Sequence, residues 1–281
     1  MRENWVRFEK VYDLPPVRLE IGVVEGPSEP VNPPAFRSRA HLLTIFSDME
    51  NFIVCDLVEG FGFGWLTESV VADTAFCRYF FLDAAMMVLL DQLYLTPVHG
   101  ALLARNGRGV LLCGESHAGK SSLAYACARE GWTFICDDAT SLLRSRNDRF
   151  AIGNPRTIRF KEEAGALFPE LQSQLVATRP NGRAGIEVLT SDLGITTSNG
   201  CVVNDIVFLN RHAGGSPRLI PVSKCDAFRR VACGLHFGVQ EVREARRKTY
   251  ERILTAGLWQ LDYENLESAV SRLDVLVGSG M

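Results

Sequence analysis

The sequence lacks a long uninterrupted run of apolar residues. Its longest apolar stretch, residues 80–95, is interrupted by Asp83 and Asp91 and is shorter than the roughly 20 residues that a transmembrane helix needs. Residues 1–5 include charged side chains and lack the apolar centre of a secretory signal peptide. These absences argue against a membrane-spanning or secreted protein, and we expect a cytoplasmic one.

The sequence also lacks paired cysteines. None of its eight cysteines occurs as C-x-x-C, and most lie within apolar segments, as Cys113 does after Leu111 and Leu112. Cysteine in such a setting behaves as a small buried hydrophobic residue, whereas metal sites and disulfide frameworks have characteristic spacings. The pattern favours reduced, buried thiols, which agrees with a cytoplasmic location.

A strong excess of charge of either sign is missing as well. The formal net charge is −3 and the pI is near 6.0, with 22% charged and 47% hydrophobic residues. These values are typical of a globular protein and give no broad attraction to nucleic acid or anionic lipid. We therefore expect neither nucleic acid nor a membrane as a partner. The 281 residues suffice for one large α/β domain or two smaller ones.

The N-terminal quarter of the chain has the composition of β-strands. Strands are predicted over residues 17–24, 40–46 and 52–58, and a long helix is predicted over residues 71–94. The glycines that follow the third strand are predicted to end the meander: Gly60, Gly62 and Gly64.

A phosphate-binding loop occupies residues 114–121. The segment matches G-x-x-x-x-G-K-[ST] at every defined position, with a predicted strand before it and a predicted helix over residues 120–130 after it. The glycines let the backbone wrap the phosphates, while the amides and the helix N-terminus supply positive potential. Lys120 is predicted to reach the β- and γ-phosphates, and the Ser121 hydroxyl to ligate Mg²⁺. The predicted ATP-binding residues are Gly114, Glu115, Ser116, His117, Ala118, Gly119, Lys120, Ser121 and Ser122.

Two aspartates, Asp137 and Asp138, follow the next predicted strand, residues 132–136. One helix connects this strand to the strand before the loop, so the two strands should be parallel and end at one edge of a sheet. Ligands bind at that edge in α/β proteins. One carboxylate would hold the metal, directly or through water, and the other would accept a proton from an attacking hydroxyl. The alternative is that one aspartate only caps the next turn.

The remainder of the chain is predicted to be a polar loop followed by a largely helical C-terminal part. Residues 176–200 are polar and contain glycine, so we expect the most mobile loop there, a candidate lid or substrate clamp. The domains are predicted as a β-rich subdomain, residues 1–75, and a P-loop domain, residues 76–281. The other predicted elements are a helix over 162–172, a strand over 202–209, helices over 225–233, 239–255 and 266–277, and a short strand over 258–261.

Residues 96–140 resemble the catalytic domain of bacterial HPr kinase/phosphorylase. In that family an H-G element, here His99-Gly100, precedes a G-x-S-x-x-G-K-S loop, and an aspartate pair ends the next strand. The resemblance weakens toward about residue 210 and does not extend to residues 1–75. It implies an α/β fold with the P-loop core that this family shares with ATP-dependent phosphoenolpyruvate carboxykinase.

The family phosphorylates a serine hydroxyl on a small carrier protein, and related lasso-peptide kinases modify a serine of a precursor peptide. The resemblance therefore implies ATP and Mg²⁺ as cofactors, a protein or peptide partner with a serine (or threonine) hydroxyl, and a homo-oligomer as one assembly. It assigns Asp137 as the catalytic base and Asp138 as the metal partner, and it makes His99 a further catalytic candidate.

Three other positions are candidates around this site. His117 stands where the family's loop has glycine, and histidine tolerates positive φ better than bulkier residues, so we expect it to be tolerated rather than catalytic. Arg156 and Arg159 follow Pro155, where their guanidinium groups would grip a phosphate or a substrate carboxylate.

Two alternatives to a protein kinase stay open from the sequence. One is a regulatory module that binds the nucleotide without transferring phosphate, and the other is a small-molecule phosphotransferase. The aspartate pair favours transfer, because pure nucleotide binding has less need of a base. The D-x-x-G and N-K-x-D motifs of GTPases do not occur.

Overall fold

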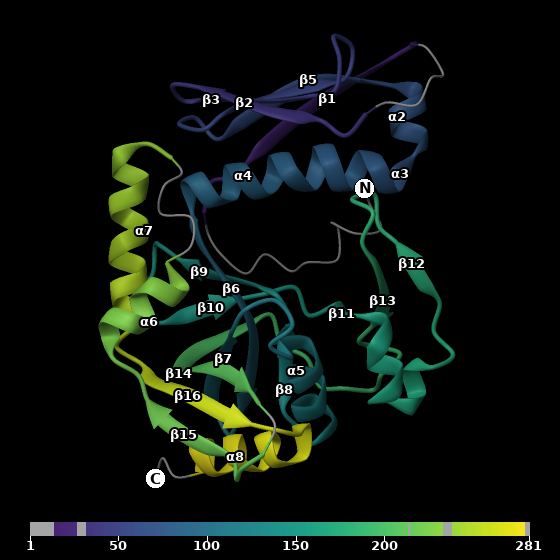
Figure 1. Ribbon diagram of the computed structural model, residues 1–281. Helices are drawn as coiled ribbons and strands as arrows, with labels where there is room; N and C mark the ends of the chain where they lie inside the picture. The colour runs from purple at the N-terminus through teal and green to yellow at the C-terminus, as the bar shows by residue number, and fades with distance from the viewer. Residues whose placement is uncertain (1–13, 27–31, 213, 233–237, 279–281) are drawn as a thin grey trace. The chain divides into compact units, whose positions relative to one another are not determined.

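The structure is a computed structural model that describes residues 14–26, 32–212, 214–232 and 238–278 (Figure 1). The chain divides into two compact units, Met1–Leu93 and Tyr94–Met281. Sheets and helices occur in both units, so the predicted α/β class is confirmed. Among the described residues, no helix is both long enough and apolar enough to span a membrane.

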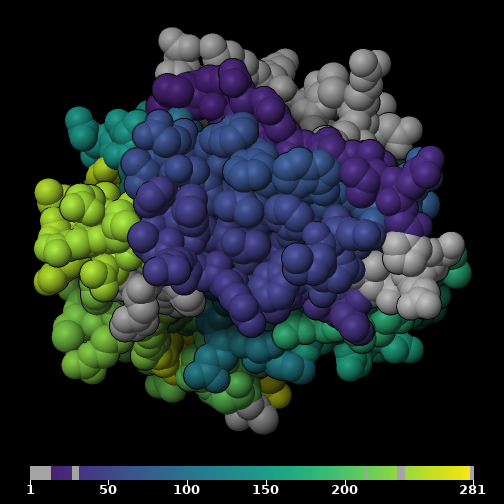
Figure 2. Space-filling model, turned by 90° about the horizontal axis from the view of Figure 1, so that it is seen from above, coloured from purple at the N-terminus to yellow at the C-terminus, as the bar shows by residue number. Residues whose placement is uncertain are grey.

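The first unit contains a five-stranded sheet in the order β1-β5-β4-β3-β2. Strand β1 pairs with β5 in parallel, and the other neighbours pair antiparallel. These strands, coloured purple to blue, fill the centre of Figure 2. Their bounds are β1 Arg18–Val24, β2 Ala35–Arg39, β3 Leu42–Phe46, β4 Phe52–Asp56 and β5 Phe61–Thr67.

The glycines near residue 60 have a different role from the one predicted. Only Gly60, at a φ of 70°, lies in the turn before β5, whereas Gly62 and Gly64 lie inside that strand. A Cβ added at Gly64 would lie 2.0 Å from the carbonyl oxygen of Phe52 on the neighbouring strand. The expectation that all three glycines end the meander was wrong, because this close backbone contact requires glycine within the strand.

The long helix predicted over residues 71–94 is interrupted. The chain turns at Asp73, whose side chain accepts a hydrogen bond from the Phe76 amide at 3.0 Å. Buried residues of the helical segments, such as Phe81 and Leu89, share a core with Ile53 of the sheet. The predicted domain boundary after residue 75 therefore falls inside this unit. The segments are α2 Glu68–Ala72, α3 Thr74–Phe76, the π-helix η1 Cys77–Leu82 and α4 Asp83–Leu93.

The second unit contains an eight-stranded sheet in the order β10-β9-β6-β7-β14-β16-β15, with β8 also paired to β6. Asn106 and Gly107, both at positive φ, form the turn between β6 and β7. The bounds are β6 Leu95–Arg105, β7 Arg108–Cys113, β8 Thr133–Cys136, β9 Ala139–Leu143, β10 Phe150–Ile152, β14 Gly200–Arg211, β15 Arg218–Pro221 and β16 Gly257–Tyr263.

Strands β7 and β8 run in the same direction, as the β-α-β pattern predicts, but they are not neighbours. Both pair antiparallel with β6, which lies between them. The carboxyl ends of β7 and β8 therefore lie beside the middle of β6, where Gly100 pairs with Cys113 and Leu102 with Cys136. Strand β14 pairs in parallel with β7, and β16 with β14, so their carboxyl ends lie on the same side of the sheet as that of β7.

Helices cover both faces of this sheet (Figure 1). Successive residues of a strand point to opposite faces of the sheet and pack in different cores. Leu112 packs in the core that contains α5 and α8, and Leu111 packs in the core that contains α6 and α7. The predicted C-terminal helices are confirmed within a few residues, although Cys233 lies outside the described residues. Their bounds are α5 Lys120–Arg129, α6 Lys224–Val231, α7 Gln240–Ile253 and α8 Leu266–Gly278.

A small antiparallel sheet in the order β11-β13-β12 occupies part of the predicted loop over residues 176–200. The prediction of an irregular segment was wrong there, because alternating Ile186 and Val188 of β13 are buried beside Phe160 in the same core. The helix predicted over 162–172 is instead two short 3₁₀ turns. The bounds are β11 Thr157–Phe160, η2 Glu162–Ala166, η3 Pro169–Leu171, β12 Val176–Thr178 and β13 Ala184–Leu189.

Replacing Leu123 by alanine tests the core around α5. Leu123 is fully buried, so Leu123→Ala should lower the free energy of unfolding by about 2–5 kcal/mol through lost burial and the cavity left behind. Leu175→Ala is the matched control, because Leu175 is 87% exposed and its loss should cost less than about 0.5 kcal/mol. Chemical denaturation followed by circular dichroism measures both, and equal effects would contradict this placement of α5.

Candidate active site

The phosphate-binding loop connects β7 to α5 and is shaped by residues at positive φ. His117 has a φ of 74° and Gly119 a φ of 88°. Histidine thus occupies a position with positive φ, and its lack of a catalytic role stays a prediction. The Tyr263 hydroxyl, at the end of β16, donates a hydrogen bond to the carbonyl oxygen of Ala118 at 2.7 Å. A Cβ at Gly119 would lie 2.6 Å from that hydroxyl oxygen, so the loop requires glycine there.

Lys120 begins α5 and lies with its ammonium group inside the loop. Its Nζ donates to the carbonyl oxygens of Gly114 at 2.9 Å and Glu115 at 3.1 Å. Burial lowers the pKa of Lys120, and the nearby Asp138 acts in the opposite direction. An ammonium, the loop amides and the N-terminus of a ten-residue helix together provide the positive cradle that a triphosphate needs. The residues present therefore fit a bound nucleoside triphosphate.

Asp137 is buried directly after β8, with 7% of its surface exposed. Its Oδ2 accepts a hydrogen bond from the Arg159 backbone N–H at 2.8 Å. Burial raises the pKa of Asp137 to about 6; the Arg159 N–H opposes this rise, and the charge of Asp138 adds to it. A carboxyl group with this pKa can take up and release a proton near neutral pH, which suits a general base.

Asp138 is more exposed than Asp137 and lies beside His99 and Gly100 of β6. Its Oδ1 lies 3.0 Å from Nδ1 of His99, with 55% of the aspartate side chain exposed. The backbone fixes this pairing, because the Gly100 N–H donates to the carbonyl oxygen of Asp138 at 2.8 Å. The Thr140 hydroxyl in turn donates to the carbonyl oxygen of Gly100 at 2.9 Å. The interposed strand β6 thus brings His99 to the aspartate pair.

These groups line one cleft of about 470 Å³. The structure brings together the phosphate-binding loop, His99 and both aspartates, as predicted, and it adds Arg159 from β11. Arg156, the other predicted arginine, is half-buried and is not among the lining residues. The basic residues that line the cleft are Lys120, Arg159, Lys161, Arg179, Arg183 and Arg211.

Sequence reasoning missed four of these basic residues, although signals for them exist. Arg179 and Arg183 flank Asn181-Gly182, a dipeptide typical of a tight hairpin turn. Lys161 follows Arg159 at the two-residue spacing that places side chains on one face of a strand. Arg211 ends β14, whose parallel pairing with β7 brings it to the loop edge.

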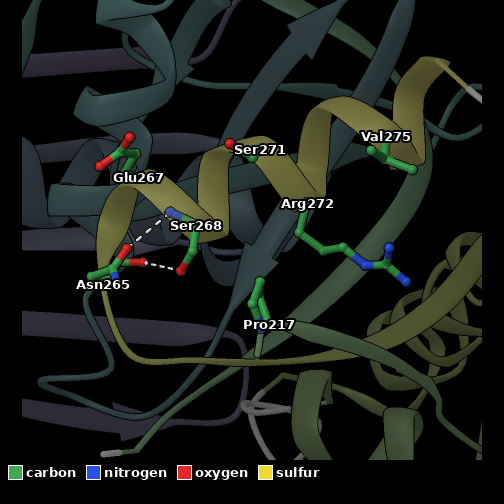
Figure 3. A pocket seen from close by; sticks show the side chains of 7 residues that line it. All are labelled: Pro217, Asn265, Glu267, Ser268, Ser271, Arg272 and Val275. Atoms are coloured by element: carbon green, nitrogen blue, oxygen red, sulfur yellow. Dashed lines mark hydrogen bonds between the residues drawn. The ribbon is translucent and has the colours of Figure 1, made fainter. Parts of the chain in front are cut away.

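A second hollow, of about 500 Å³, lies on α8 (Figure 3). Arg272 and Glu267 are its charged lining residues. Asn265 and Ser268, which also line it, bond to each other in the helix cap, with the Ser268 N–H donating to Asn265 Oδ1 at 2.9 Å. The hollow does not include the phosphate-binding loop or the aspartate pair, and we therefore place the candidate active site in the other cleft.

Comparison with known proteins supports the predicted family. No protein-family model matches the chain. The HPr kinase/phosphorylase of Bordetella pertussis is 41% identical over 69 residues, which is 22% of each chain. The HPr kinase/phosphorylase of Halalkalibacterium halodurans is 35% identical over 72 residues, covering 26% of this chain and 23% of that protein. The predicted resemblance to HPr kinase/phosphorylase is thereby confirmed over about a quarter of the chain, and the matched segment spans less than a quarter of these relatives.

Among solved structures, the HPr(Ser) kinase/phosphatase from Coxiella burnetii matches with a TM-score of 0.33 and 15% sequence identity. The match covers 66% of this chain and 99% of that chain.

Replacing Gly119 by alanine tests the shape of the loop. Gly119→Ala introduces both a strained positive φ and a collision with the Tyr263 hydroxyl, whereas Gly107→Ala, at a φ of 75° with no atom within 4 Å, introduces the strain alone. Strain of this kind costs about 1–2 kcal/mol, so Gly119→Ala should destabilise the protein more than Gly107→Ala in chemical denaturation. Adding Tyr263→Phe should recover part of the difference, and no recovery would contradict the proposed collision.

Proposed function

We propose that the protein is an ATP-dependent kinase that transfers the γ-phosphate to a serine (or threonine) hydroxyl of a protein or peptide. The observation that supports this most is the buried carboxyl of Asp137, with its pKa raised to about 6, in the same cleft as the phosphate-binding loop. Nucleotide binding alone needs no such base, whereas transfer to a hydroxyl does.

On the nucleotide side, the loop amides and Lys120 would hold the β- and γ-phosphates. Lys120 would exchange its present bonds to the carbonyl oxygens of Gly114 and Glu115 for phosphate oxygens. Ser121 and Asp138 would hold Mg²⁺, which typically takes one or two protein ligands together with phosphate oxygens and water. When bound, Mg²⁺ neutralises charge on the transferring phosphate.

On the acceptor side, Asp137 would accept the proton of the attacking hydroxyl. The serine oxygen forms a bond to the γ-phosphorus, the bond to the β–γ bridging oxygen breaks, and ADP leaves with that electron pair. The contrast between the two aspartates supports this division of roles. Asp137 is buried and hydrogen-bonded to Arg159, while Asp138 is exposed beside His99, where a hydrated metal has room.

Positioning and electrostatics would supply most of the rate enhancement, as in phosphoryl transfer generally. His99 would orient Asp138 through their 3.0 Å contact. Arg159, which lines the same cleft, would stabilise charge on the transferring phosphate.

The name of the relatives, HPr kinase/phosphorylase, agrees with phosphotransfer at this site. We propose the forward kinase direction in the cytoplasm, with ATP and Mg²⁺ as cofactors and a protein or peptide as the partner. A small-molecule phosphotransferase would use the same residues with a different acceptor. Each of these reactions needs Asp137 as a base, unlike a purely regulatory nucleotide-binding module.

Variants of Lys120 and Asp137 separate binding from transfer. Lys120→Ala should abolish both ATP binding and phosphotransfer, because it removes the cation that contacts the phosphates. Asp137→Asn should leave the affinity for MgATP within about twofold and lower phosphotransfer at least roughly a hundredfold, the usual contribution of a general base. Calorimetry measures the first quantity, and transfer from γ-labelled ATP to acceptors in a cell lysate measures the second.

Lys248→Ala, on the exposed face of α7, is the matched control and should behave as the unaltered protein. If Asp137→Asn transferred phosphate at the normal rate, the assignment of the base would be wrong. If the unaltered protein bound MgATP and labelled no acceptor, a regulatory module would become the better account.

The pH dependence of transfer should report the ionisation of Asp137. A general base must be deprotonated to act, so kcat/KM should rise with pH and level off above the pKa of about 6. Below that pH the value should fall about tenfold per unit. In Asp137→Asn the residual activity should lack this acid limb. A limb centred near pH 4 would show that the carboxyl is not in the environment described.

A further inference from the structure

Three charged side chains at the small sheet contact one another, and two of them, Arg159 and Arg179, line the cleft. Oε2 of Glu187 lies 3.0 Å from Nε of Arg159 and 3.5 Å from an Nη of Arg179. All three side chains are partly exposed. One carboxylate thus contacts two guanidinium groups.

Arg183 adds a second positive charge at the same end of the hairpin. The Arg179 N–H donates to the carbonyl oxygen of Arg183 at 3.1 Å, and the Gly182 N–H donates to that of Arg179 at 2.9 Å, so a tight turn places both arginines at its base. Both line the cleft, and no carboxylate in the described ranges forms an ion pair with Arg183.

The hairpin is connected to the base through β11, whose end also approaches the phosphate-binding loop, where Nζ of Lys161 lies 2.6 Å from Nδ1 of His117. Asp137 accepts its hydrogen bond from the backbone of Arg159 in β11, and Arg159 stands opposite Glu187 in the pairing of β11 with β13. Strand β12, which leads to Arg179, pairs with β13 in turn. Groups on the hairpin therefore lie on the side of the cleft where the acceptor hydroxyl would meet Asp137.

We propose that Arg179 and Arg183 bind a carboxylate of the acceptor, so that the substrate of this kinase is an acidic protein or peptide segment with Asp or Glu near the phosphorylated serine. This inference rests on the proposed function. The guanidinium group is suited to the task because its planar donors match a carboxylate in a bidentate arrangement. The loop amides and Lys120, with Mg²⁺ when bound, would neutralise the triphosphate.

The test of this proposal is the rate at which the protein transfers phosphate from γ-labelled ATP to each member of a positional-scanning library of serine peptides. For the unaltered protein, peptides with Asp or Glu at one or more positions near the serine should have a kcat/KM at least about tenfold above their Asn or Gln counterparts, a difference of about 1.4 kcal/mol. Arg183→Glu should remove or reverse that preference and favour Lys or Arg at the same positions. Arg183→Gln should reduce it without reversal.

The control is Arg243→Glu, an exposed arginine of α7 outside the cleft, which should keep the acidic preference. The affinity for MgATP is measured for each variant by calorimetry, and circular dichroism confirms that each is folded. Because Arg183→Gln removes the guanidinium charge without introducing an opposite one, it keeps the test decisive if Arg183→Glu does not fold.

Different results contradict the two proposals. If the unaltered protein binds MgATP but labels no serine peptide, the proposed kinase function fails. If it labels acidic and neutral peptides equally well, the kinase function stands and the acidic-acceptor proposal fails. That proposal also fails if Arg183→Gln weakens MgATP binding while leaving the peptide preference intact, because the arginine would then serve the nucleotide.

Discussion

The site depends on one hydrogen bond, from the backbone N–H of Arg159 to the buried carboxylate of Asp137. It joins the strand end of the main sheet to the first strand of the small sheet. It also partly compensates the burial that raises the pKa of Asp137 to about 6. Without this donor, a carboxylate in that position would have a still higher pKa and would be protonated near neutral pH. The same contact thus affects the pKa of the proposed base and joins the small sheet to it.

The order of strands explains why the other groups meet there. Because β6 lies between β7 and β8, its middle residues lie beside the two carboxyl ends, and His99 reaches Asp138. On the far side of the loop, β16 ends at Tyr263, whose hydroxyl holds the carbonyl oxygen of Ala118. The phosphate-binding loop is therefore held between a covalent connection to α5 and a tertiary contact from a distant strand.

The parts of this arrangement that were predictable from sequence are those with local causes. The loop motif, the helix that begins at Lys120 and the shared direction of the flanking strands follow from spacing and chain connectivity. The position of β6 between those strands was not predictable, since strand order depends on which distant segments pair. The hairpin with its turn at Asn181-Gly182 was missed because its strands are short and β12 is exposed. Only the turn dipeptide and the buried alternation of Ile186 and Val188 mark it. Gly64 was misread as a turn because close packing against β4, not local conformation, requires glycine there.

The most direct test of this account is a ¹³C NMR titration of the aspartate side-chain carboxyl groups. The Asp137 resonance is assigned by its loss in Asp137→Asn. The account predicts that it titrates with a midpoint near pH 6, well above the ordinary aspartate value of about 4. A midpoint at or below 4 would show that the carboxyl is solvated or held in its charged form, and that Asp137 is not the buried base on which the proposed kinase mechanism rests.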